Sequence, residues 1–265
     1  CSQSRGLGDV YKRQSQDSEI RRVAAENGWL VKNDYLNNPF IQSRSNNFQF
    51  RSTIQPLNSF RIQLDAKRIV SENFQETFRF DSQKDTYVSL TPSRGGNFSL
   101  SFLAIKTAFV KDDNLNNSPT FERFAKNRLI IRDRLNSLNS QGEYGLNSQD
   151  VLIPAFISAY SDSDPSTFSL KPFPKIPIPN WRIDFSGLSK IKSLSEIFSS
   201  ITISHGYQSI YSVGEFSNSL LYIDNLDFNN SIMNYPLASQ QTENGFVPFY
   251  IINQVRITER FSPLI

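Results

Sequence analysis

The side chains that could do chemistry are few and scattered along this chain. The lone histidine, His205, follows Ser204, but neighbouring residues of a strand point to opposite faces and cannot share a proton. The Arg-Gly-Gly run at residues 94–96 lacks the lysine and the strand–helix setting of a phosphate-binding loop. The Asp-Ser-Asp run at residues 162–164 lacks the glycine and the distal glutamate of a calcium loop. We therefore expect structural roles for these residues, with no enzymatic activity and no cofactor.

Composition narrows the function classes further. The only cysteine is Cys1 and the only histidine is His205, which argues against thiolate or histidine metal centres. The chain carries 28 basic and 25 acidic side chains. Residues 1–14 hold three of the basic and one of the acidic groups, so the remainder, with 25 and 24, is almost neutral and predicts no nucleic-acid binding.

The aromatic content points to β-structure. The chain has 22 Phe and 10 Tyr, yet its mean hydropathy is −0.41. No window approaches the roughly 20 apolar residues of a membrane-spanning helix. A polar chain rich in Phe and Tyr fits a soluble β-sandwich, and it also fits a membrane barrel whose strands are apolar only at alternate residues.

The two ends of the chain suggest truncation. It begins at Cys1 without a methionine and stops at Ile265 inside a predicted strand. Residues 1–14 have no apolar core of a signal peptide and resemble read-through sequence, so we leave them out of the fold. The alternative for these residues is a disordered native terminus.

The clearest pattern is a strict alternation of apolar and polar side chains over residues 48–54 and 60–67. Such alternation puts all the apolar side chains on one face of a hairpin, with residues 55–59 as its turn. The apolar set, expected to face lipid or a protein core, is Phe48, Phe50, Ile54, Phe60, Ile62, Leu64 and Ala66. The charged set, expected to face a water-filled lumen or solvent, is Arg51, Arg61, Asp65 and Lys67.

Two kinds of protein fit this hairpin. Each strand has about the 9–11 residues that cross an outer membrane at a tilt, with lipid on one side and a lumen on the other. An antiparallel sheet of a soluble protein, with the same face against a core, would show the same alternation.

Helical signals interrupt the strands. Residues 17–30 predict a short helix that Gly28 ends. Ser118, followed by a proline, is a good helix start, and Asp150 favours the first turn of a second helix. Residues 118–160 are therefore expected to form a helical insertion between strands.

The rest of the chain alternates between extended and short helical segments. Prolines between residues 172 and 179 force an extended connector, and residues 188–197 suggest a small helix. Further strands are expected over residues 74–81, 98–109, 181–185, 201–213, 220–228 and 249–261.

Several segments, in a consistent order, resemble one known family. They are residues 27–30, 36–40, 48–67, 105–109, 147–156, 203–207 and 259–265. The family is SprA, also called Sov, the giant outer-membrane β-barrel translocon of the type IX secretion and gliding-motility system. The chain from about residue 20 onward resembles a small internal part of it.

The resemblance implies a fold, a location and partners. The fold is mainly β, with antiparallel strands of an incomplete outer-membrane β-barrel, of about 36 strands in the family, and a helical insertion. The implied segments are wall strands with a short helix over 15–117, the insertion over 118–160, a Pro-rich connector over 161–180 and further wall strands over 181–265. The insertion and connector would line or cap the lumen. The implied location is the outer membrane of a Gram-negative bacterium.

The implied function is protein transport to the cell surface. The partners would be outer-membrane lipid, secreted cargo proteins, a PorV-type barrel and a plug protein. Two other hypotheses stay open: a different outer-membrane barrel, such as a nutrient receptor or porin, and a soluble β-rich module that binds carbohydrate or protein.

Overall fold

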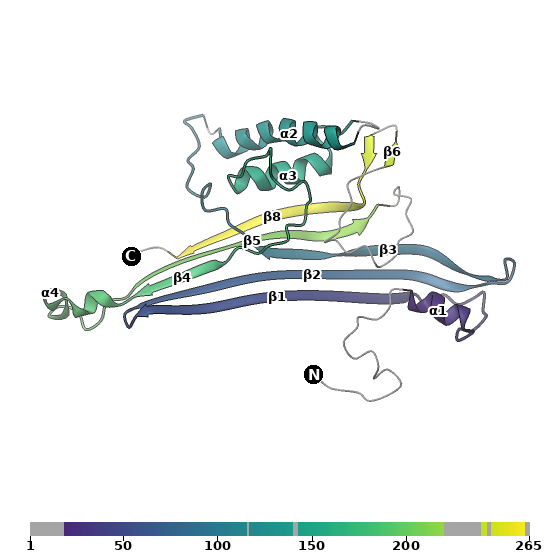
Figure 1. The fold of residues 1–265 in the computed structure, drawn as a ribbon, viewed down its shortest axis with the longest axis horizontal. Coiled ribbons are helices and arrows are strands. Elements are labelled where there is room, and N and C mark those ends of the chain that lie inside the picture. Colours follow the sequence, from purple (N-terminus) through teal and green to yellow (C-terminus); the bar gives the residue numbers. More distant parts are fainter. Residues whose placement is uncertain (1–18, 116, 140–142, 220–239, 243–244, 263–265) are drawn as a thin grey trace.

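The computed structural model describes residues 19–115, 117–139, 143–219, 240–242 and 245–262. The strand expected over residues 220–228 and the stretch 1–14 lie outside these ranges. Figure 1 shows a long layer of strands with two helices stacked beside one edge and shorter helices at both ends.

The sheet is antiparallel and has six strands. Its order runs β1 (Phe40–Leu57), β2 (Phe60–Asp81), β3 (Thr86–Ser101), β5 (Ile203–Asn218) and β8 (Tyr250–Ser262), with β4 (Asn180–Phe185) between β2 and β5. A separate two-stranded hairpin is formed by β6 (Gln240–Thr242) and β7 (Gly245–Val247).

The predicted hairpin is present and is longer than expected. The two strands are joined at residues 58–59, so the turn is tighter than the predicted residues 55–59. The run over residues 74–81 continues β2, which reaches 22 residues. At about 3.3 Å per residue, β2 extends for roughly 70 Å. This is about twice the length that a tilted strand needs to cross a membrane.

Strands β3 and β4 occupy one position in the sheet, one after the other. Ser101 of β3 pairs with Ile210 of β5, and Trp181 of β4 pairs with Tyr207. Asn180, the first residue of β4, falls opposite Gln208, so only the place opposite Ser209 is left between β3 and β4. Because β3 and β4 run in the same direction between the same neighbours, they are two parts of one interrupted strand.

Hydrogen bonds close the interruption. The main-chain N–H of Phe102 donates to the carbonyl of Ser209 at 3.0 Å, so Phe102 fills the vacant place. The N–H of Ser209 donates to Asn180 Oδ1 at 2.8 Å, and the N–H of Ile178 donates to the Ser101 carbonyl at 3.0 Å. Residues 103–179 are therefore an excursion from a single strand.

The expected strand over residues 98–109 is wrong beyond Ser101. The chain turns off the sheet although its side chains continue to alternate. Phe102 and Ala104 are buried in the core beneath the helices, and the Ala104 N–H donates to the Tyr207 hydroxyl at 2.9 Å. The Tyr207 side chain thus replaces the main-chain carbonyl that would accept this hydrogen bond in a sheet. The local sequence pattern does not reveal this replacement, because Tyr207 is distant in sequence.

The helical insertion is built as its sequence predicts. Helix α2 (Pro119–Leu138) begins after Ser118 with proline in its first turn, and α3 (Gln149–Tyr160) begins after Ser148 with Asp150 in its first turn. A core cluster joins the two helices; its buried members are Ile131, Leu135, Tyr144, Val151 and Ala155. Asn127 donates to Ser158 Oγ at 2.9 Å within this interface.

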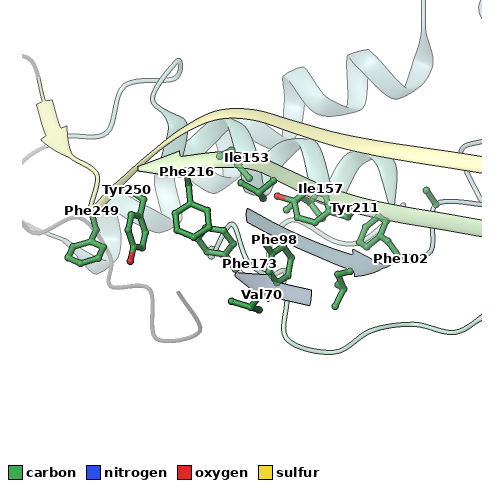
Figure 2. Packing of buried hydrophobic residues seen from close by; sticks show 13 residues of the cluster. Val70, Phe98, Phe102, Ile153, Ile157, Phe173, Tyr211, Phe216, Phe249 and Tyr250 are labelled. Atoms are coloured by element: carbon green, nitrogen blue, oxygen red, sulfur yellow. The ribbon is translucent and has the colours of Figure 1, made fainter. Parts of the chain in front are cut away.

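Helix α3 and the Pro-rich segment pack on the apolar side of the sheet. Figure 2 shows Ile153 and Ile157 of α3 beside Phe98 and Tyr211, members of one buried cluster. Phe173 of the Pro-rich segment meets the Phe98 ring, with the centroids 5.4 Å apart. Both segments therefore lie on the side of the sheet opposite to the charged residues of β1 and β2, and the expectation that they line or cap a lumen stays a prediction. Apolar residues of α3 find their partners on the apolar face instead.

Replacement of Ile157 by alanine tests this packing. Ile157 is fully buried between α3 and the sheet. We expect Ile157→Ala to lower the free energy of unfolding by about 2–5 kcal/mol, through lost transfer energy and a cavity. The control Leu129→Ala, on exposed α2 surface, should cost less than about 1 kcal/mol. Urea unfolding of both variants measures the difference; equal effects would contradict the packing of α3 on the sheet.

Short helices lie at the two ends of the sheet (Figure 1). Helix α1 (Ile20–Glu26), within the predicted range 17–30, lies near the end formed by the β2–β3 connection. At the other end, the 3-10 helix η2 (Gly187–Lys190) and α4 (Lys192–Ser195) replace the single small helix expected over residues 188–197.

Candidate functional site

The strand pairing assigns every strand residue to one of two faces, because directly paired residues of an antiparallel sheet point the same way. Phe50 pairs with Ala66, and Ile54 pairs with Ile62. Alternation along β1 and β2 adds the other predicted apolar residues, so all seven share one face, the apolar face. Arg51 pairs with Asp65, and Arg61 and Lys67 join them on the opposite face, the polar face.

The apolar face is covered over only part of its length. Beneath the insertion, side chains such as Phe98 and Leu100 are almost fully buried. Toward the β1–β2 turn, Phe48, Phe50 and Ile54 are 47%, 45% and 47% exposed. We call this uncovered part the apolar band; its members are Phe48, Phe50, Ile54, Leu57, Phe60, Ile62, Leu64, Trp181, Ile183 and Phe185.

Aromatic rings gather at two levels of the band. Phe60 and Phe185 meet edge to face near the β1–β2 turn, with centroids 6.2 Å apart. Farther along, Tyr207 lies 4.7 Å from Trp181 and 5.1 Å from Phe261, centroid to centroid. Trp181 pairs with Leu64, which lies opposite Ser52, so the second level of rings lies inside the band, between Ile54 and Phe50.

The segment after β4 extends this apolar surface beyond the strands. Ile191, Ile197 and Phe198 are 46%, 73% and 51% exposed. The Ser186 N–H donates to the Ser59 carbonyl at 2.8 Å, which ties the segment to the β1–β2 turn. Exposed apolar side chains therefore continue from the band to the tip of the sheet.

The covered half of the apolar face holds charged groups. Glu72, Glu76 and Arg94 are each at most 4% exposed, and Arg21 of α1 forms an ion pair with Glu76. Burial raises the pKa of Tyr250, in this half, to about 12. The sequence analysis did not predict these buried charged groups. The signal that could have found them is the position of Glu72 and Glu76 on the same face of β2 as Val70 and Phe74. Such a surface is unsuited to lipid, so only the band is a candidate membrane surface.

The polar face contains a hollow of about 500 Å³ behind the band. Arg51 of β1 and Arg260 of β8 both line it, although three strand positions separate β1 from β8. Two residues so far apart across a sheet share a hollow only when the sheet curves toward that face. The polar face is therefore concave and the apolar face is convex.

The side chains that the sequence analysis considered for catalysis or metal binding either lie on opposite faces of the sheet or form hydrogen bonds and ion pairs with other residues. His205 pairs with Ile183 on the apolar face, whereas Ser204 points to the polar face and donates to Asp184. Asp162 forms ion pairs with Arg123 and Lys106, so its carboxylate faces cations. Among the described residues, no three His, Cys, Asp or Glu side chains are grouped as metal ligands would be.

No protein-family profile matches the chain, and no curated protein matches it. Within the described residues, every helix is too short or too polar to cross a membrane.

Proposed function

We propose that this chain is part of the wall of an outer-membrane β-barrel through which proteins are transported to the cell surface. The direction of curvature carries the proposal. The concave side bears the charged and amide side chains, and the convex side bears the apolar band. Membrane barrels with aqueous lumens are polar inside and apolar outside. Closed soluble sheets enclose an apolar core instead.

Strand length and the open edges support the same proposal. The band covers residues 48–57 of β1, which is about the length of a tilted membrane strand. The covered half would then extend beyond the bilayer, with the insertion packed on its outer side. Within the described residues, β1 and β8 pair on one side only, so both edges are open to neighbouring wall strands.

Transport of protein, rather than of small solutes, rests on the resemblance to the SprA family. On that basis the partners are secreted cargo on the concave side, lipid on the convex side, and a PorV-type barrel and a plug protein. A nutrient receptor or porin would have the same inside-out polarity of its wall. The large insertion argues against a porin, whose strands are joined by short turns on one side.

A second candidate is a soluble β-rich binding module. The observation in its favour is the packing of α3 on the apolar face, because a helix over one side of a sheet is an ordinary soluble architecture. That candidate leaves the band without cover among the described residues.

Replacement of band residues distinguishes the two candidates. We expect Phe48→Ser/Phe50→Ser/Ile54→Ser to reduce incorporation of the chain into bilayers at least tenfold, because each half-buried side chain contributes about 1 kcal/mol or more of transfer energy. Flotation with phosphatidylethanolamine–phosphatidylglycerol vesicles measures the incorporated fraction.

The matched control uses the opposite face of the same strand. Gln49→Ser/Arg51→Ser/Thr53→Ser alters as many side chains of β1, and we expect incorporation to stay within twofold of the original. Equal incorporation of the band variant and the original chain, or a monomeric chain that unfolds cooperatively in water without detergent, would favour the soluble module.

A further inference from the structure

The concave face is basic behind the apolar band, although the chain as a whole is nearly balanced in charge. Five cations lie on this part of the polar face against two carboxylates, Asp65 and Asp184. The cations are Arg51, Arg61, Lys67, Arg182 and Arg260. A basic concave surface concentrates anionic ligands near it.

A glycine, Gly206, lies at the base of the hollow. Gly206 of β5 lies between Arg182 and Ser262 in the pairing. A Cβ atom at this position would lie 3.3 Å from the Ser262 Cβ, closer than most such contacts. With no side chain on Gly206, the space between Arg182 and Arg260 is left to solvent or to a ligand.

The arginines of the hollow are available to a ligand. Arg260 forms no ion pair with any residue that the structure describes. The other two are exposed arginines that pair with half-buried carboxylates, Arg51 with Asp65 at 3.3 Å and Arg182 with Asp184 at 3.1 Å. Exposed ion pairs of this kind contribute little, so a ligand carboxylate can compete for the guanidinium groups, which bind carboxylates through two parallel hydrogen bonds.

The surroundings favour a polypeptide ligand over a nucleic acid or a sugar. Gln63 and Gln208 line the hollow and can bond with peptide groups. Trp181 and Tyr207 also line the hollow, but the strand pairing directs their rings to the convex face, which disfavours stacking with bases or sugar rings on the concave side. Hydrogen-bonding amides beside guanidinium groups suit an extended, acidic peptide.

We propose that this hollow binds a carboxylate-rich polypeptide segment across β5, between Arg182 and Arg260. The identity of that segment as part of a transported protein rests on the proposed function. Binding itself does not, because a soluble module with the same hollow would bind the same peptide.

Peptide binding to the full chain in neutral detergent micelles tests the proposal. Fluorescence anisotropy with labelled deca-glutamate should show saturable binding that weakens as salt screens the charges. Deca-glutamine and deca-lysine should bind at least tenfold more weakly. We expect Arg182→Ser/Arg260→Ser to weaken deca-glutamate binding at least tenfold, and Arg260→Gln alone, at an exposed position of β8, to weaken it severalfold.

The control removes the same charge elsewhere. Lys111→Ser/Lys126→Ser changes two exposed cations within residues 103–179, and its deca-glutamate affinity should stay within twofold of the original. Equal losses in the two double variants, or equal binding of deca-glutamate and deca-glutamine, would overturn the proposal. Loss of vesicle incorporation in the band variant reports on the wall function separately, so either proposal can fail without the other.

Discussion

A chain in which Phe102 is joined directly to Asn180 should keep its sheet in register. Removal of residues 103–179 leaves Phe102 opposite Ser209, the place it already fills, and Asn180 next to it. Leu100, Phe102 and Trp181 then fall on the apolar face by simple alternation. We expect one uninterrupted strand in place of β3 and β4.

The matched control removes one residue more. If Ser101 is joined directly to Asn180, every side chain of β4 moves to the opposite face, because the side-chain period of a strand is two. Trp181 would then lie on the polar side or leave the sheet, and Asn180 would enter the apolar face. The two deletion products differ by one residue, Phe102, and they are expected to place Trp181 on opposite faces of the sheet.

Fluorescence of Trp181 in detergent micelles distinguishes the two deletions. The chain has two tryptophans, and Trp29→Phe removes the other, which is 68% exposed. Emission should remain blue-shifted in the longer product and shift to the red in the shorter one. The same emission from both would show that β3 and β4 are not parts of one strand.

Water should be a poor solvent for either deletion product. The insertion covers Val70, Phe98 and Val213, which are each at most 3% exposed. Without α3, this surface joins the apolar band into one continuous apolar face. We therefore make the comparison in micelles, where an apolar surface has a partner.

Local patterns of the sequence were sufficient for most elements. Period-two alternation predicts β4, β8, most of β2 and the second half of β1, and the Ser–Pro start of α2 follows from helix-terminus chemistry. The position of the insertion in the sheet could not be predicted. It depends on Ser209 and Tyr207, which lie about a hundred residues beyond the point where the chain leaves the sheet.

The candidate site was predictable in its polarity but not in its shape. Alternation alone separates Phe60, Ile62 and Leu64 from the charged residues of β2. The curvature depends on how five strand positions twist and bulge together, and it decides whether the charged face is inside or outside. The hollow joins Arg51 to Arg260, a pairing that no local window contains.

The buried ion pair between Arg21 and Glu76 should be the strongest single attachment of α1 to the sheet. The two side chains are 3% and 1% exposed, and the Ser89 hydroxyl also donates to Glu76. The Arg21 guanidinium lies over the Phe74 ring, 5.0 Å from its centroid. Removal of Glu76 leaves the buried Arg21 guanidinium with the more distant Glu19, at 3.6 Å, as its ion-pair partner, so we expect Glu76→Ala to cost about 3–5 kcal/mol.

A double replacement separates the ion pair from the packing around it. Arg21→Met/Glu76→Leu removes both charges and keeps apolar volume against Phe74, so its loss of stability should be within about 1 kcal/mol of zero. Arg22→Met provides the control within the same helix, because Arg22 is 47% exposed and pairs with Glu19 on the surface.

The consequence for α1 follows from its length. A helix of seven residues does not persist in water by itself, so loss of its attachment to the sheet should unfold it. Hydrogen exchange over residues 20–26 should become fast in Glu76→Ala and stay protected in Arg22→Met. Protected amides in Glu76→Ala would mean that contacts with Phe40 and Phe78, rather than the ion pair, hold α1 on the sheet.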